Sequence, residues 1–332
     1  MAEASARCIA FDMEGPLTSQ DAAFELMGLV PGGHEVFRAI SRYDDILALS
    51  GRPDYEPGDT LALIVPFVLY HRLGVFHIER LAEAAPLVKG AREVIAQLAA
   101  DGYEVYCITT TYEQYARRVA QRLDLAAERV ACTSFPLEEL QGRLERKDIE
   151  AVAQVDLAVR KLDVEKDEGR LRALFDAFYW QELPGTLLGE AVASVKPVGG
   201  RRKVRALGEF AAASQPELCR WVVVGDSITD NAMLSAVSNA GGLAIVFNGN
   251  RYALECGTVG VASLTLTDLL PLLRAWEEGG LKGARDFVSR SAKYAEAPGP
   301  HYHWLAGGDV TDALAVHTRF RHQVRQEAAA LG

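Results

Sequence analysis

Four short apolar runs that end in polar residues constrain the fold of this chain more than any other feature. Each run is rich in β-branched or aromatic residues, and segments with the apolar spacing of amphipathic helices separate the runs. Continuously apolar strands are typical of parallel sheets that helices cover on both faces. The alternation therefore predicts an α/β doubly wound parallel sheet. The predicted strands are RCIAFD (7–12), YEVYCIT (103–109), RWVVVGD (220–226) and GLAIVFNGN (242–250).

The spacing between these strands is uneven, and the excess residues predict two insertions. After the first strand, about seventy residues with helical periodicity precede the next core helix, more than a plain crossover needs. They predict a mostly helical cap at 17–88. A second excess, opened by EELQGRLERKDIE, predicts another insertion of open shape at 135–195. The other predicted parts are a core made of 1–16, 89–134 and 196–285, and a C-terminal tail at 286–332.

Charge and cysteine content indicate a globular protein whose partner is a small molecule. The 332 residues include 45 acidic and 35 basic side chains, and the formal net charge of −10 disfavours nucleic acid and anionic membranes as partners. The five cysteines lack CxxC spacing, which predicts neither a disulfide framework nor a zinc site. The longest apolar run, 61–70, is too short to span a bilayer, and the first residues do not resemble a leader. We therefore expect a cytoplasmic location.

Polar residues terminate every predicted strand. Ligands bind beyond the carboxyl ends of the strands in a doubly wound sheet, so these residues are the candidates for a site. Four carboxylates in one crevice repel one another unless a cation lies among them, and a set of oxygen ligands suits Mg²⁺, which in turn implies a phosphate ligand. The strand-end residues are Asp12 with Glu14, Thr109 with the next two threonines, Asp226 with Asp230, and the run Asn248-Gly249-Asn250.

Four motifs in order resemble those of the haloacid dehalogenase-like superfamily, most of whose members are Mg²⁺-dependent phosphatases. The resemblance covers residues 7 to 258, and it is strongest to phosphoserine phosphatase-like members. It implies a Rossmann-like core, Mg²⁺ as cofactor, and a small phosphorylated metabolite as the substrate of a phosphoric monoester hydrolase. The motifs are DMEGPLT (12–18), CITTT (107–111), Lys203 at the start of a helix, and VVVGDSITDNAML (222–234).

The resemblance also implies catalytic roles. Asp12 matches the nucleophilic aspartate, and Glu14 matches the acid/base residue. Thr109 matches the hydroxyl residue that binds phosphate. Lys203 matches the motif lysine better than Lys196 does, because its distance in sequence from the fourth motif is close to the usual one.

The implied metal site consists of Asp12, Glu14 through a nearby backbone carbonyl, Asp226, and Asp230 in support. Most phosphatases of the superfamily carry Asp where this chain has Glu14, although enolase-phosphatases and a phosphoserine/homoserine phosphotransferase branch also carry Glu. Members that cleave carbon–halogen or phosphonate bonds lack a carboxylate there, so Glu14 favours phosphate esters. The cap segment DTLALIVPFVLYHRLG stays apolar until residues 71–72, which disfavours phosphoserine because its phosphatases place an arginine in the cap.

Three functions remain open from the sequence. The leading one is a phosphatase, the second is a phosphotransferase or phosphomutase of the same chemistry, and the third is a non-catalytic binding protein with the same fold. Several other features receive no catalytic role. His301 and His303 are interpreted as surface or packing residues, aromatic residues of the insertions as core, and the basic stretch 319–325 as the solvated face of a helix.

Overall fold

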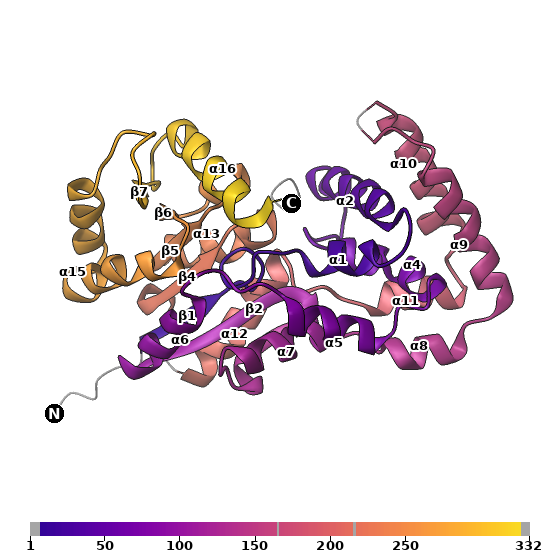
Figure 1. The fold of residues 1–332 in the computed structure, drawn as a ribbon, viewed down its shortest axis with the longest axis horizontal. Coiled ribbons are helices and arrows are strands. Elements are labelled where there is room, and N and C mark those ends of the chain that lie inside the picture. Colours follow the sequence, from indigo (N-terminus) through magenta and orange to yellow (C-terminus); the bar gives the residue numbers. More distant parts are fainter. Residues whose placement is uncertain (1–6, 165, 215–216, 327–332) are drawn as a thin grey trace.

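The computed structural model describes residues 7–164, 166–214 and 217–326 (Figure 1). Within these residues, seven strands form one sheet in the order β3-β2-β1-β4-β5-β6-β7, and only the last pairing, between β6 and β7, is antiparallel. The predicted α/β doubly wound fold is confirmed. The strands are β1 (Arg7–Phe11), β2 (Tyr103–Tyr112), β3 (Val130–Thr133), β4 (Trp221–Gly225), β5 (Leu243–Phe247), β6 (Val259–Ala262) and β7 (His301–Trp304).

The four predicted strands correspond to β1, β2, β4 and β5, whereas β3, β6 and β7 were not predicted. Each of the missed strands has four residues, too few to show a period in the sequence. β7 lies in the predicted C-terminal tail, and it extends the sheet by pairing with β6. The first six and last six residues of the chain, which the predicted core and tail include, lie outside the described residues.

Helices cover both faces of the sheet, and the side chains of β1 show why. Cys8 and Ala10 pack with apolar residues of α12 and α13 on one face. Ile9 and Phe11 pack with residues of α6 and α15 on the other. The helices are α1 (Ala22–Gly28), α2 (Gly33–Leu49), α3 (Thr60–Leu63), α4 (Val65–Tyr70), α5 (Val75–Ala84), α6 (Ala91–Ala100), α7 (Glu113–Arg122), α8 (Leu137–Arg143), α9 (Arg146–Val159), α10 (Glu168–Ala177), α11 (Leu187–Ser194), α12 (Arg201–Ser214), α13 (Asn231–Asn239), α14 (Arg251–Leu254), α15 (Leu269–Arg290) and α16 (Thr311–Arg325).

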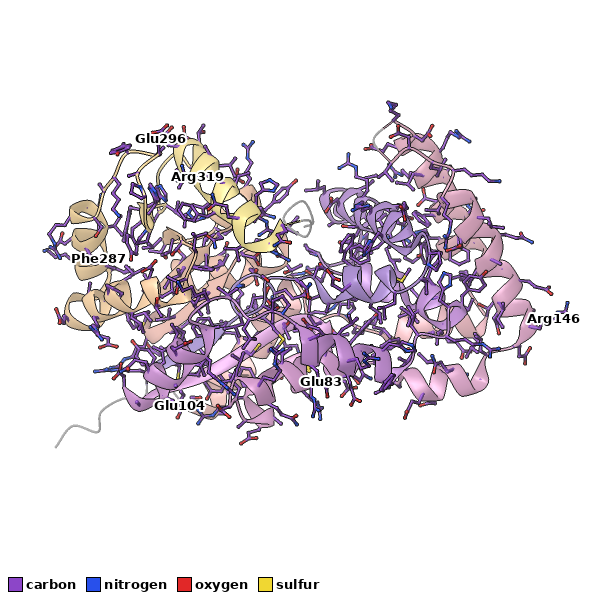
Figure 2. All side chains as sticks on the ribbon, viewed as in Figure 1. Glu83, Glu104, Arg146, Phe287, Glu296 and Arg319 are labelled. Carbon is purple, nitrogen blue, oxygen red and sulfur yellow. The ribbon has the colours of Figure 1, made fainter. Side chains whose placement is uncertain are left out.

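The two insertions form one helical body beside the sheet, on the right of Figure 1. Helix α4 contacts α9 and α11, and α2 contacts α9 and α10, so helices from both insertions share contacts. The Tyr179 hydroxyl donates a hydrogen bond to the Leu63 carbonyl at 2.6 Å, and the Tyr43 and Phe175 rings lie 5.1 Å apart. Charged side chains such as Glu83 and Arg146 cover the outside (Figure 2). The predicted boundaries of the core, the cap, the second insertion and the C-terminal tail remain predictions.

The described helices fall short of the length and hydropathy of a membrane span. Among the described residues, no single helix is long and apolar enough to cross a membrane. Residues Thr60–Tyr70 and Val75–Ala84 reach that hydropathy only as a pair, which is bent by 119°.

Candidate active site

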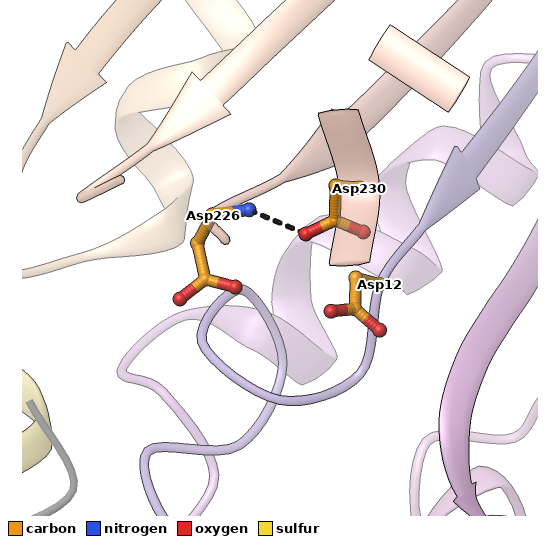
Figure 3. Close-up of side chains that lie close together, drawn as sticks. All are labelled: Asp12, Asp226 and Asp230. Atoms are coloured by element: carbon orange, nitrogen blue, oxygen red, sulfur yellow. Dashed lines mark hydrogen bonds between the residues drawn. The ribbon is translucent and has the colours of Figure 1, made fainter. Parts of the chain in front are cut away.

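Three aspartates converge where β1 and β4 end (Figure 3). In the register of these strands Phe11 pairs with Val224, so the residues that follow, Asp12 and Asp226, leave the sheet at the same edge. Asp230 lies in the turn after β4. Ligand oxygens of the three carboxylates lie within 4.8 Å of one another, and all three side chains are buried. The structure thus brings together the three aspartates of the predicted site.

Lys203 lies between two of these carboxylates. Its Nζ is 2.8 Å from Asp12 Oδ1 and 2.7 Å from Asp230 Oδ1, and the side chain is fully buried. Burial lowers the pKa of this lysine, but the two carboxylates outweigh burial and raise it above its usual value. Lys196, the alternative candidate, is exposed and lines a different cleft. The lysine preferred from the sequence is therefore the one at the carboxylates.

Asp230 has both oxygens engaged by the protein itself. Its Oδ1 contacts Lys203, while its Oδ2 accepts hydrogen bonds from the backbone N–H groups of Asp226 at 2.9 Å and Ser227 at 3.1 Å. The first of these bonds is the dashed line in Figure 3. This arrangement fixes the turn that carries Asp226, so Asp230 supports the site by holding its neighbours.

Asp12 is held in place but carries an unbalanced charge. Its Oδ1 accepts a hydrogen bond from the backbone N–H of Met13 at 2.8 Å, in addition to the contact with Lys203. Burial and the neighbouring carboxylate of Asp230 raise the pKa of Asp12 to about 7, although Lys203 opposes them. The crevice thus favours a further cation beside Asp12.

Asp226 supplies an oxygen that fits such a cation. Among the described residues, its buried Oδ1 has no hydrogen-bond partner, whereas its Oδ2 contacts Arg321 and lies 2.7 Å from Arg325 Nη1. The backbone at Gly15 passes over this carboxylate with φ +100°, and a Cβ atom there would lie 2.4 Å from it. An unpartnered carboxylate oxygen among other carboxylates is a donor set that Mg²⁺ prefers.

The two arginines at Asp226 correct one interpretation of the sequence. The stretch 319–325 was interpreted as a solvated helix face, but Arg321 and Arg325 are only 3% and 6% exposed. They extend from α16 to a strand end about a hundred residues earlier in the chain. The available signal was the four-residue spacing of His317, Arg321 and Arg325, which places three basic side chains on one face of a helix.

Glu14 lines the same pocket as Asp12 and Asp226. Its Oε1 accepts a hydrogen bond from the backbone N–H of Ala22, at the start of α1, at 2.5 Å. Burial and then the carboxylate of Asp21 raise the pKa of Glu14 well above its usual range, against the effects of the Ala22 N–H and Arg325. A raised pKa favours the protonated form of the carboxyl group, which suits a residue that donates a proton.

The three threonines near the end of β2 take different positions. Thr109 is fully buried, and its Oγ1 bonds to the N–H of Thr111 at 3.2 Å and lies 3.3 Å from the Thr111 hydroxyl. Thr110 and Thr111 line the pocket that contains Asp12. The phosphate-binding role of Thr109 stays a prediction, and the next two hydroxyls are further candidates.

A loop of the helical body lies against the start of α12, the helix that carries Lys203. Glu56 is buried and accepts a hydrogen bond from the backbone N–H of Arg201 at 3.0 Å, and Asp59 pairs with Arg202. Between them Gly58, with φ +95°, would place a Cβ atom 2.8 Å from Thr110. These contacts hold the loop over the edge of the sheet at the pocket.

Comparison with known proteins shows the family of the chain. A model of the haloacid dehalogenase-like hydrolases matches residues 6–238. No curated protein matches the chain. Among solved structures, a gene product of Archaeoglobus fulgidus is 28% identical, with a TM-score of 0.86 over 99% of each chain.

Two phosphoserine phosphatases share the fold at lower identity. One, described as a phospho-aspartyl intermediate analogue, is 17% identical with a TM-score of 0.53, covering 80% of this chain and 98% of that chain. The other, a substrate-bound complex, is 16% identical with a TM-score of 0.52, covering 81% and 99%. The family model extends over more than half of the sequence and includes all the predicted site residues. The chain therefore belongs to the haloacid dehalogenase-like hydrolase family and is an enzyme.

Proposed function

We propose that this enzyme is a Mg²⁺-dependent phosphatase that hydrolyses a small phosphorylated metabolite through a phosphoaspartate at Asp12. One observation carries the proposal: the Asp12 carboxylate has Lys203 2.8 Å from its Oδ1, and nearby lies the Oδ1 of Asp226, which has no hydrogen-bond partner within the described part of the chain. A nucleophilic carboxylate needs positive charge around it, because the phosphoryl oxygens are negative. The shared fold of a phosphoserine phosphatase described as a phospho-aspartyl intermediate analogue supports the same chemistry.

Asp12 and Asp226, with a backbone carbonyl near Glu14, are the groups that would hold Mg²⁺. The donor set fits the ion because it consists of oxygen atoms and includes a buried carboxylate oxygen that lacks a partner among the described residues. When bound, Mg²⁺ supplies positive charge that neutralises the phosphoryl oxygens during transfer. Lys203 and the hydroxyls of the pocket supply the positive charge and hydrogen bonds that come from the chain itself.

The first step is attack by a carboxylate oxygen of Asp12 on phosphorus. The new O–P bond forms as the bond from phosphorus to the substrate's oxygen breaks, and the electron pair leaves with that oxygen. Glu14, whose protonated form is favoured by burial and by the Asp21 carboxylate, donates its proton to the departing alkoxide. The products of this step are the free alcohol, phosphorylated Asp12 and ionised Glu14.

The second step releases phosphate. Ionised Glu14 takes a proton from a water molecule, and the water oxygen attacks phosphorus as the bond to Asp12 breaks. This step restores the carboxylate of Asp12 and the proton on Glu14. If an alcohol takes the place of water, the same residues carry out phosphoryl transfer, which is the chemistry of the alternative function.

The test is a screen of phosphorylated metabolites that measures released phosphate with Mg²⁺, with chelator, and with Ca²⁺. We expect activity to require Mg²⁺ and Ca²⁺ to inhibit, because Ca²⁺ accepts looser coordination and misplaces the nucleophile. Full activity in chelator would refute the metal assignment. Added acceptor alcohols distinguish the alternative, because only a phosphotransferase forms phosphorylated product at the expense of free phosphate.

A further inference from the structure

We propose that helix α16 is a working part of the active site: Arg321 and Arg325 hold one oxygen of Asp226 so that the other faces the metal position. The inference rests on the proposed function, because it assigns a positioning role for that reaction. Neither arginine belongs to the four motifs that identify the site. Both reach it from the last helix of the described chain.

One face of α16 is directed at the strand ends. His317, Arg321 and Arg325 follow one another at four-residue intervals, so their side chains share a face of the helix. His317 is fully buried, and its Nδ1 accepts a hydrogen bond from the backbone N–H of Gly249 at 3.0 Å, just after β5. In Figure 1, α16 runs from the sheet towards the helical body. Its C-terminal part therefore reaches the pocket.

Arg321 connects three acceptors at the ends of two strands. Its Nη1 contacts Asp226 Oδ2 and lies 3.3 Å from the Asp226 carbonyl and 3.4 Å from the Asn248 carbonyl. The guanidinium thus joins the end of β4 to the end of β5. All three contacts are made by one nitrogen of this charged group.

The two carboxylate oxygens of Asp226 differ in their interaction partners. Oδ2 receives both guanidiniums, with Arg325 Nη1 at 2.7 Å, while the buried Oδ1 has no partner among the described residues. Rotation of the carboxylate would break two charge-assisted hydrogen bonds inside a buried site, so these bonds fix its orientation. Arg325 also lines the pocket together with Glu14 and Asp21, which places it beside the reacting groups.

The docking of α16 does not depend on these arginines alone. Ala313, Val316 and Phe320 are buried apolar residues of the same helix, and α16 contacts β6. Arg319, labelled in Figure 2, lies instead beside His301, with Nη2 3.5 Å from the His301 Nε2. Loss of either buried arginine should therefore change the site more than the position of the helix.

The experiment compares Arg321→Gln and Arg325→Gln with wild type and with Arg205→Gln. Arg205 is a matched control because it is an exposed arginine of α12 that pairs with Glu209. One readout is the electron paramagnetic resonance spectrum of Mn²⁺ bound without substrate, which reports the geometry around the ion. The others are the Mn²⁺ Kd, kcat at saturating Mg²⁺, and the Tm of the metal-free protein.

We expect both buried-arginine variants to alter the Mn²⁺ spectrum and to lower kcat by about 10- to 100-fold, as the loss of other groups that orient metal ligands does. The Mn²⁺ Kd should stay within about threefold of the wild-type value. Loss of the positive charge beside Asp226 strengthens binding of the ion, and this gain offsets the weakening that follows when the Asp226 carboxylate is no longer held in its orientation. The Arg205→Gln variant should match wild type in every readout. Arg321→Lys should recover only part of kcat, because an ammonium keeps the charge but is more strongly hydrated and stands on a more flexible stem.

Two results would overturn the inference. An unchanged Mn²⁺ spectrum with unchanged kcat would show that the arginines do not orient Asp226. A higher Mn²⁺ Kd together with a lower metal-free Tm would show that they only stabilise the fold. If the wild-type protein releases no phosphate from any ester, the proposed function fails, but the Mn²⁺ spectra still decide whether α16 positions Asp226.

Discussion

The two ends of the crevice balance their charges in opposite ways. At Asp12, two carboxylates share the single ammonium of Lys203, and the pKa of Asp12 is raised to about 7. At Asp226, one carboxylate receives two guanidiniums from α16. Counted by these ion pairs, the first end has fewer cations than carboxylates, whereas Asp226 has two cations for its one carboxylate. We infer that the Asp12 end accommodates a further cation, while Asp226 is held in a fixed orientation.

The largest expected effect separates the two ends by their response to Mg²⁺. Asp12→Asn should lower phosphate release by at least about 10⁴-fold at every Mg²⁺ concentration, because it removes the nucleophile. Asp226→Asn should also be impaired, but its deficit should shrink as Mg²⁺ rises, because an amide oxygen is a weaker ligand for the metal. Initial rates of phosphate release over a Mg²⁺ titration measure the deficits of both variants. Recovery of Asp12→Asn at high Mg²⁺ would contradict the assignment of the nucleophile.

Glu14 lines the same pocket as Asp12 and Asp226, and its substitution tests which residue moves the proton. Glu14→Gln keeps the nucleophile but removes a proton donor and acceptor worth about 10²–10⁴ in rate. An alkyl phosphate should show most of this loss. With p-nitrophenyl phosphate, whose leaving group departs without a proton, the phosphoaspartate should form and then persist.

Rapid mixing should therefore show a burst of nitrophenol followed by a stalled steady state in Glu14→Gln. The Asp12→Asn variant is the control, because without the nucleophile it should show no burst. Equal damage to both substrates and both steps would mean that another residue moves the proton.

A smaller effect, on stability, tests the shortage of positive charge at the Asp12 end. Lys203→Met leaves two buried carboxylates without their shared cation, so the free energy of unfolding without metal should fall by about 3–5 kcal/mol. Denaturant unfolding measures the loss. Lys282→Met, at an exposed pair with Asp286, is the matched control and should change stability by less than about 1 kcal/mol. A similar small loss for both lysines would show that Asp12 and Asp230 do not depend on Lys203.

The strand-end residues could be predicted because a parallel sheet brings the carboxyl ends of its strands to one edge. Asp12 and Asp226 follow apolar strands that are visible in the sequence. Lys203 was preferred to Lys196 because its distance in sequence from Asp226 resembles that in the haloacid dehalogenase-like superfamily. The shared helical body could not be predicted. Its contacts join distant segments, as the bond between Tyr179 and Leu63 shows, and no local pattern encodes them.

The arginines of α16 escaped prediction for a related reason. A basic helical stretch is usually solvated, and burial of Arg321 depends on where α16 lies relative to β6 and β5. That position follows from the end of the sheet, where β6 and β7 are too short to show a period. The spacing of His317, Arg321 and Arg325 predicts that their side chains share one face of a helix, but it does not predict which part of the protein that face contacts.

Another buried carboxylate, Asp44 on α2, extends the comparison because hydrogen-bond donors without charge hold it. Its Oδ1 accepts a hydrogen bond from the Tyr55 hydroxyl at 2.5 Å, and its Oδ2 accepts one from the Gly58 N–H at 3.4 Å. Burial raises the pKa of Asp44 to about 7, although the hydroxyls of Tyr55 and Thr60 oppose the shift. The folded protein therefore binds this proton more tightly than the unfolded chain does.

The sign of the pH effect follows from that difference. Between the ordinary pKa of 3.8 and a folded value of about 7, the folded state holds more protons, so the free energy of unfolding falls as pH rises. Asp44→Asn should remove up to about 1.4 kcal/mol of this fall per pH unit. The substitution also disturbs hydrogen bonds, which lowers the free energy of unfolding by the same amount at both pH values. That amount cancels in the difference between the free energies of unfolding measured with urea at pH 5 and at pH 7. Asp101→Asn, at an exposed turn, should keep the wild-type slope. Parallel slopes for wild type and Asp44→Asn would mean that Asp44 is ionised throughout this range and that its hydrogen bonds are sufficient to hold the charge.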